Sequence, residues 1–163
     1  MTFRSVRGWV FFAAALVFIA DRLTKYVIVN SLTAAESIRV IPGIFHVTLV
    51  LNNGAGFGIF RNMGVMFILM TFVAVVLILF YVLRSKAMSA PLAAAFGLIL
   101  GGALGNLVDR IKFGYVIDFL DFRVWPVFNI ADSAITVGAA ILVLNIFFEK
   151  KRNSSNIKDQ IPK

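Results

Sequence analysis

Aspartate and asparagine are the side chains of this sequence whose types and spacing could do chemistry. They interrupt otherwise apolar segments at Asp21, Asn52, Asn106, Asp109, Asp118, Asn129 and Asp132. Ionisable groups at membrane depth are costly, and therefore indicate function. Two aspartates held together cannot both ionise easily, so they share a proton. The ionised member can take a proton from water while the protonated member polarises an amide carbonyl, which is the chemistry of peptide-bond hydrolysis.

Other hydrolytic chemistries lack their characteristic residues. The sequence has no cysteine and one histidine, which excludes disulfides, thiolate catalysis, zinc fingers and iron–sulfur clusters. His46 has no G-x-S-x-G segment to accompany it, and we interpret it as a surface strand residue. H-E-x-x-H and a phosphate-binding Walker loop are also absent. We therefore expect neither a metal nor a cofactor.

The residues alone leave open which aspartates pair. Asp118 and Asp121 lie three apart in an extended segment, so they point to opposite faces and only one can reach a common site. Asp132 lies on the same side of a helix as Asn129. The same spacing fits a helix start, with Asn129 as the cap and Asp132 in the first turn.

Several polar or small residues also have purely structural interpretations. Asp109 is followed by Arg110, which fits an interfacial ion pair that would keep the aspartate ionised. Asp21 and Lys25 are four residues apart and can pair on one helix face. A four-residue spacing typical of close helix packing is found at Gly97, Gly101 and Gly105.

The elements that must position these residues are membrane helices. Of the 163 residues, 60% are hydrophobic and 15% charged, whereas soluble domains average about 45–50% and about 25%. Such a chain has too little polar surface for a soluble enzyme, and its length fits one domain. Apolar segments of about 20 residues predict spans at about 8–30, 63–83, 87–108 and 127–148, followed by a polar, disordered tail at 149–163.

The charges indicate how these spans are oriented. The first apolar run follows Arg4 and Arg7 as in a signal peptide, but no small-x-small cleavage site follows and the run continues to residue 30. Four spans put nine basic residues on the side of the termini, and most of the remaining seven sit beside carboxylates. This predicts that both termini are cytoplasmic. The net charge of +8 lies at the ends of apolar runs, not in a stripe that would bind nucleic acid.

The connection after the first span is rich in strand and turn residues. Ser37–Ile41 and Phe45–Leu51 are strand-like and flank a Pro42-Gly43 turn. The predicted fold is therefore an all-α integral membrane protein, with four transmembrane helices and a small β-rich extracytoplasmic element between helices 1 and 2. Gly54–Phe60 has three glycines in five residues, and we expect it to move over the site.

Five segments in order resemble one known family. They are Asp21-Arg22-Leu23-Thr24-Lys25, Asn52–Phe57, Gly101–Arg110, Val116–Phe119 and Phe128–Ser133. The sequence resembles the lipoprotein signal peptidases, or signal peptidase II, which are bacterial membrane aspartic peptidases. The resemblance implies that Asp118 and Asp132 are the catalytic dyad. It places supporting or substrate-binding roles on Asp21, Asn52, Gly54, Asn106, Asp109, Arg110 and Asn129, and Gly56 stands where alanine is common.

The same resemblance implies a substrate and a location. The family cleaves before a cysteine that carries a diacylglyceryl thioether and releases the signal peptide. Implied partners are lipid-modified prolipoproteins, membrane lipid and cyclic peptide inhibitors of the globomycin type. The implied location is the bacterial cytoplasmic (inner) membrane, with a multi-pass chain and the site at the outer leaflet. One chain supplies the whole dyad, so we expect a monomer.

Two other classes of function remain as alternatives. A proton- or ion-coupled transporter would use intramembrane aspartates, but here they cluster at one interface, and spans two to four carry no charge in their inner halves. A non-catalytic scaffold would place every aspartate in a structural ion pair. Asp118 has no basic neighbour in its own segment, although Arg123 could reach it.

Overall fold

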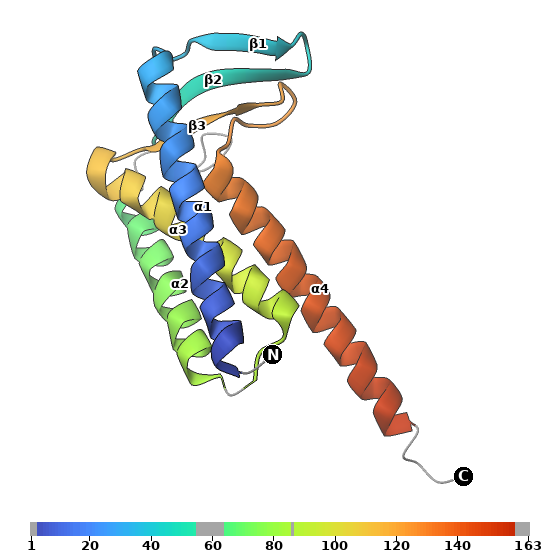
Figure 1. Ribbon diagram of the computed structural model, residues 1–163. Helices are drawn as coiled ribbons and strands as arrows, with labels where there is room; N and C mark the ends of the chain where they lie inside the picture. The colour runs from blue at the N-terminus through green and yellow to red at the C-terminus, as the bar shows by residue number, and fades with distance from the viewer. Residues whose placement is uncertain (1–2, 55–63, 86, 159–163) are drawn as a thin grey trace.

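The computed structural model describes residues 3–54, 64–85 and 87–158, and it is mostly helical. In chain order the elements are α1 (Phe3–Ser31), β1 (Ser37–Ile41), β2 (Phe45–Asn52), α2 (Gly64–Arg84), α3 (Ala90–Phe113), β3 (Val116–Asp121) and α4 (Ile130–Lys158). The sheet lies across one end of the helices, and α4 diverges from the other helices toward the opposite end (Figure 1).

Within the described residues, three helices are long and apolar enough to cross a membrane. They are α2, α3 and the Ile130–Glu149 part of α4. Helix α1 spans 29 residues but carries Asp21, Arg22 and Lys25 in its second half. The predicted helices are therefore present, and three of them have the properties of membrane spans.

Close packing of α3 against two helices depends on glycine. A Cβ atom at Gly101 would lie 2.5 Å from the backbone oxygen of Ala14 in α1, which cannot move away. On the other face of α3, a Cβ at Gly102 would clash with the backbone oxygen of Ala131 in α4. The predicted packing role of the glycine spacing is confirmed, and α3 is the central helix of the bundle.

The sheet contains one strand more than the sequence predicted. Strands β1 and β2 form the expected hairpin, but β3 pairs antiparallel with β2 and gives the order β1-β2-β3. The predicted β-rich element between helices 1 and 2 is therefore present, and the segment after α3 adds a third strand to it. Strand β3 is buried on both faces and lacks the alternation that reveals a half-buried strand.

Helices α3 and α4 end later than predicted. Helix α3 begins at Ala90, after the cap residue Ser89, and continues past residue 108 to Phe113, where Gly114 ends it with a φ of 79°. Helix α4 continues to Lys158, so a disordered tail from 149 was wrong for residues 149–158. Extending an existing helix needs no new nucleus, and the polar residues here include good helix formers.

Part of the predicted mobile segment lies outside the described residues. This applies to residues 55–60 of the Gly54–Phe60 segment, including Gly56. Gly54 itself is described: it is buried directly after β2, and its backbone N–H donates to Asn52 Oδ1 at 3.0 Å. The start of the segment is thus held at the edge of the sheet.

Candidate active site

Strand β3 and the start of α4 are joined by backbone hydrogen bonds. Leu120 N–H donates to the Phe128 carbonyl at 2.8 Å, and Phe128 N–H donates back at 3.1 Å. Asp118 in β3 and Asp132 in the first turn of α4 therefore come from two segments with a fixed relative position. Both aspartates line a cavity of about 310 Å³. Other residues that line it include Asn52, Gly54, Phe67, Arg110, Trp125 and Phe128.

Two asparagine amides bind the carboxylate of Asp118. Asn129 Nδ2 donates to Oδ1 at 2.7 Å, and Asn52 Nδ2 donates to Oδ2 at 2.9 Å. Asp118 lies opposite Val50 in the β2–β3 register, so Asn52, two residues further along β2, is its diagonal neighbour on the same face. The fold thus places one donor on each oxygen of Asp118.

Asp132 is held by the start of its own helix and by α3. Asn106 Nδ2 donates to its Oδ1 at 2.7 Å, and the backbone N–H of Asn129 lies 3.3 Å from its Oδ2. In return, Asn129 Oδ1 accepts from the backbone N–H of Asp132 at 2.9 Å. The predicted helix cap is confirmed. The cap and the site use the same two residues.

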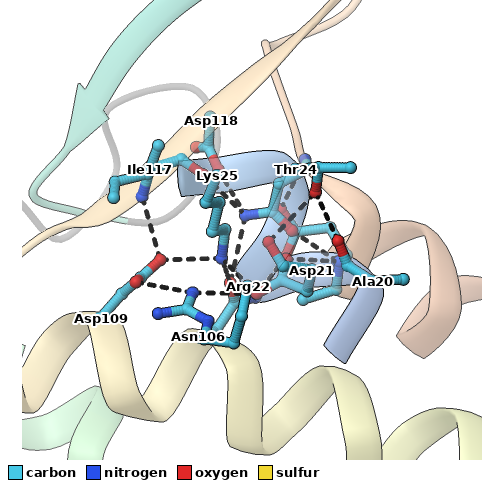
Figure 2. Close-up of polar contacts among 12 residues, drawn as sticks. Ala20, Asp21, Arg22, Thr24, Lys25, Asn106, Asp109, Ile117 and Asp118 are labelled. Carbon is cyan, nitrogen blue, oxygen red and sulfur yellow. Dashed lines mark hydrogen bonds and ion pairs between the residues drawn. The ribbon is translucent and has the colours of Figure 1, made fainter. Parts of the chain in front are cut away.

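A second group of charges, which we call the ion cluster, lies beside these two aspartates. It consists of Asp21, Arg22 and Lys25 in α1 and Asp109 in α3 (Figure 2). Lys25 Nζ lies 2.9 Å from Asp21 Oδ2 and 2.7 Å from Asp109 Oδ2. Arg22 Nη2 lies 2.9 Å from Asp21 Oδ2 and 2.7 Å from Asp109 Oδ1. The negative charges of the two carboxylates are therefore compensated by the positive charges of the two cations within the bundle.

The ion cluster confirms one predicted pair and corrects another. Asp21 pairs with Lys25 as expected. The proposed ion pair between Asp109 and Arg110 was wrong, because Asp109 points to the cations of α1. Consecutive residues point in different directions on a helix, and Arg110 instead lines the cavity with its guanidinium carbon 5.2 Å from the centroid of the Phe67 ring.

Each aspartate of the ion cluster also binds the backbone next to a cavity aspartate. Asp21 Oδ1 accepts from the N–H of Ala131, the residue before Asp132, at 3.1 Å. Asp109 Oδ2 accepts from the N–H of Ile117, the residue before Asp118, at 3.2 Å (Figure 2). The ion cluster therefore fixes both cavity aspartates relative to α1 and α3.

Comparison with known proteins decides which family has this arrangement. The family model described as signal peptidase (SPase) II matches residues 13–148. The lipoprotein signal peptidase of Halothermothrix orenii is 43% identical over 142 residues, covering 87% of this chain and 97% of that protein. The corresponding protein of Moorella thermoacetica is 48% identical over 130 residues, covering 79% and 86%. This chain belongs to the signal peptidase II family.

A solved structure supports the same assignment. A bacterial membrane enzyme determined by the in meso method at 2.3 Å has a TM-score of 0.83 and 31% identity, covering 96% of this chain and 95% of that one. The resemblance drawn from the motifs is confirmed, and the signal peptidase II enzymes are membrane-embedded aspartic peptidases that process prolipoproteins. The transporter and scaffold alternatives are therefore set aside.

The surroundings of Asp118 suit an acid that exchanges a proton near neutral pH. Burial raises the pKa of Asp118 to about 7, and the negative charge of Asp132 adds to this effect. The hydrogen bonds from Asn52 and Asn129 and the positive charge of Lys25 oppose the rise. In this peptidase Asp118 is 2% exposed, yet it lines an open cavity where water can reach it.

Asp121 belongs to a different part of the peptidase. Its Oδ2 accepts from Thr48 Oγ1 at 2.8 Å and from Arg123 Nη1 at 3.0 Å. The predicted separation of Asp118 and Asp121 onto opposite faces of β3 is confirmed. Arg123 pairs with Asp121 and not with Asp118. Asp121 therefore stabilises the sheet, away from the cavity.

His46 is a strand residue as expected, but it is not on the surface. It lies in β2 opposite Asp121 and is only 8% exposed. Its Nδ1 lies 3.3 Å from Ser37 Oγ, which in turn is 2.8 Å from Thr48 Oγ1. His46 thus belongs to a polar network within the sheet.

Sequence reasoning missed the ion cluster that Arg22 and Lys25 form with Asp21 and Asp109. The motif that contains them was noted, and the pairing of Lys25 with Asp21 was expected, but no role in the site was assigned to either cation. The four-residue spacing from Asp21 to Lys25 was the available signal. It could not show that the second carboxylate would come from Asp109, far away in the sequence.

Proposed function

We propose that Asp118 and Asp132 are the catalytic dyad of this signal peptidase II, and that they cleave diacylglyceryl-modified prolipoproteins just before the lipidated cysteine. One observation carries the proposal. These two carboxylates come from separate elements and line one cavity, and hydrogen-bond donors of Asn129 bind both of them. The other buried carboxylates of α1 and α3 are neutralised by Arg22 and Lys25.

The dyad hydrolyses the peptide bond with one water molecule. The ionised aspartate takes a proton from water as the water oxygen attacks the carbonyl carbon, and the protonated aspartate donates its proton to the carbonyl oxygen. The tetrahedral diol then loses a hydroxyl proton to the aspartate that was protonated at the start. The aspartate that took the proton from water passes it to the departing nitrogen, and the carbon–nitrogen bond breaks. The dyad thereby returns to its starting state with one shared proton.

The remaining predicted site residues support this dyad in different ways. Asn52, Asn106 and Asn129 orient the two carboxylates through their amides. Asp21 and Asp109 hold the backbone beside each catalytic aspartate. Gly54 and Arg110 line the cavity, where the positive charge of Arg110 would stabilise negative charge that develops on the carbonyl oxygen.

An apolar cavity next to the dyad fits the lipid-bearing substrate. It has a volume of about 520 Å³ and shares Trp125, Phe128 and Asp132 with the first cavity. Its walls continue along α4 through Ser133, Thr136 and Val137. A substrate that arrives through the membrane can place acyl chains along this wall, as can membrane lipid. Cyclic peptides of the globomycin type would inhibit by occupying the same cavities, and a monomer suffices because one chain carries both aspartates.

We further propose that residues 1–163 form one membrane domain with α1 as its fourth span. Its 29 residues reach about 43 Å, enough to cross a bilayer. Asp21 and Lys25 are buried, whereas Leu16, Ile19 and Leu23 are exposed, so the face away from the bundle is apolar. Arg22 is the partly exposed charge of this region and pairs with both aspartates of the ion cluster.

Both termini then lie in the cytoplasm and the dyad lies at the outer leaflet of the bacterial inner membrane. The cysteine-free chain allows single cysteines to test this with Ala34→Cys and Ser155→Cys. In intact cells an impermeant thiol reagent should label position 34 and leave position 155 unlabelled. Labelling of position 155 would contradict this topology.

The reaction itself is tested with purified protein and two substrates. One is a diacylglyceryl-modified prolipoprotein, and the other is the same precursor without the lipid. Mass measurement should show release of the signal peptide from the lipidated precursor only, with the lipidated cysteine as the new N-terminus. Cleavage at another bond, or equal cleavage of both precursors, would refute the proposed specificity.

A further inference from the structure

Lys25 is a buried cation with more partners than ion pairing requires. Its side chain is 2% exposed, and an ammonium group has three N–H donors. Two of them point to the carboxylates of Asp21 and Asp109. The third donates to a neutral acceptor, Asn106 Oδ1, at 3.1 Å (Figure 2). Lys25 therefore connects the ion cluster to the amide that contacts the dyad.

This contact determines which way round the Asn106 amide lies. An ammonium only donates, so Asn106 must turn its carbonyl oxygen toward Lys25. The same oxygen accepts from Asn129 Nδ2 at 3.1 Å. The NH₂ group of Asn106 must then face Asp132, where Nδ2 lies 2.7 Å from Oδ1. The reversed amide would set NH₂ against the ammonium and a carbonyl oxygen against the carboxylate.

The two members of the dyad therefore have different surroundings. Asp132 receives a donor whose amide is polarised by a contacting ammonium, and it lies in the first turn of α4, where the helix dipole favours negative charge. Asp118 lies in a strand, which has little dipole, and its donors are the amides of Asn52 and Asn129. A single negative charge is stabilised better on Asp132 than on Asp118.

We propose that Lys25 is a positioning residue of the dyad, which acts through Asn106 to keep the resting negative charge on Asp132 and to leave the shared proton on Asp118. This inference rests on the proposed function. It assigns the roles that the dyad mechanism leaves open. Asp132 takes the proton from the attacking water, and Asp118 donates its proton to the carbonyl oxygen of the scissile bond.

The charges around Asp118 make this assignment measurable. Asp132 faces it from α4, Lys25 from α1 and Arg110 from α3, while β2 contributes the neutral Asn52. Activity that requires a protonated Asp118 is lost as the pH rises through the pKa of this residue. Lys25 opposes the rise of that pKa. Removing Lys25 should therefore move the alkaline limb of the pH–rate profile to higher pH.

Arg22 provides a matched control within the same ion cluster. It binds the same two carboxylates as Lys25, and the described residues show no hydrogen bond from it to Asn106. Arg22→Gln and Lys25→Met each remove one cation from the ion cluster. A purely structural role for Lys25 predicts that the two variants behave alike.

The experiment measures kcat, KM and the pH profile of folded wild type, Lys25→Met and Arg22→Gln with a diacylglyceryl-modified prolipoprotein. Lys25→Met should lower kcat about 10- to 100-fold with KM within about twofold, and its alkaline limb should move upward. Arg22→Gln should lose thermal stability but keep the wild-type alkaline limb and kcat within about threefold. Equal kcat losses and limbs in both variants would overturn the inference.

A second variant tests the route through Asn106 and is available if Lys25→Met does not fold. Asn106→Ala keeps all four contacts of the ion cluster and should lower kcat about 10- to 100-fold. Adding Lys25→Met to Asn106→Ala should change kcat by less than about twofold, because both act on one contact. Wild-type kcat in Asn106→Ala, or losses that multiply, would overturn the inference. Failure of the dyad itself is distinguishable, because it would appear as activity in Asp118→Asn or Asp132→Asn.

Discussion

The ion cluster and the dyad each contain two aspartates in one layer of the molecule, and the two pairs are stabilised in opposite ways. Asp21 and Asp109 are fully buried, and each contacts two cations within 3 Å. Asp118 is nearly as buried, but its hydrogen-bond partners are the neutral amides of Asn52 and Asn129. The difference separates carboxylates that hold the fold together from carboxylates that can exchange a proton.

The physical reason lies in how each environment treats a proton. Two cations close to a buried carboxylate compensate its charge, and removing either partner of such an ion pair is strongly destabilising. Amide donors stabilise a carboxylate more weakly and leave lone pairs free for a proton that moves during reaction. A peptidase of this kind needs both environments, because the ion cluster must hold the backbone in place while the dyad changes its protonation.

The largest effect is expected from removing a carboxylate of the dyad. Asp118→Asn or Asp132→Asn should lower kcat about 100- to 10,000-fold, because an amide cannot exchange a proton at working pH. Each variant sets an NH₂ group against one of the donors that bound the carboxylate, so its stability should fall by about 1–3 kcal/mol, much less than the loss in rate. Turnover and thermal unfolding measured on the same preparations would check both statements. Cleavage near the wild-type rate in either variant would show that this is not the dyad.

The opposite pattern is expected in the ion cluster. Asp109→Asn leaves Arg22 and Lys25 with one carboxylate between them and should cost about 3–5 kcal/mol of unfolding free energy. Rate per folded molecule should fall less than in the dyad variants, because Asp109 acts on the dyad indirectly, by holding Lys25 and the backbone of Ile117. An Asp109→Asn protein as stable as the wild type would remove the distinction between the two pairs.

The pH dependence of stability and of activity should reveal the proton that Asp118 holds. The pKa of Asp118 is about 7 in the folded protein and about 3.9 in an unfolded chain, so the folded state holds an extra proton between these values. Stability relative to Asp118→Asn should therefore fall as the pH rises through this window and level off above it. The value of kcat/KM should fall as the pH rises through about 7. A kcat/KM that stays constant from pH 6 to pH 9 would contradict the role of Asp118.

The smallest effect is expected from the aspartate that lies on the other face of β3. Asp121→Asn keeps acceptor oxygen for Thr48 and Arg123, so it should cost only about 1 kcal/mol of stability. Its kcat should stay within about threefold of the wild type, because Asp121 is absent from the cavity lining. A loss as large as that of Asp118→Asn would indicate that the two faces are coupled.

Features set by short-range rules were predictable from the sequence. The apolar runs predicted the helices, the period of two separated Asp118 from Asp121, and the cap spacing located the start of α4 at Asn129. Partners that meet only after folding were not predictable. Asp109 binds cations more than 80 residues earlier in the chain, and nothing in its own segment distinguishes them from Arg110. The segment that becomes β3 was expected to be extended, but its pairing with β2 was missed because β3, buried on both faces, has no alternating pattern that marks it as part of the sheet.

The most direct test of the dyad is the cleavage rate of the double variant Asp118→Asn/Asp132→Asn beside both single variants. All three are assayed on the same lipidated prolipoprotein at equal concentrations of folded protein. If the two carboxyls act as one unit that shares a proton, the double variant should be no slower than either single variant, within about threefold. A rate reduced by the product of the two single losses would contradict a shared role for Asp118 and Asp132.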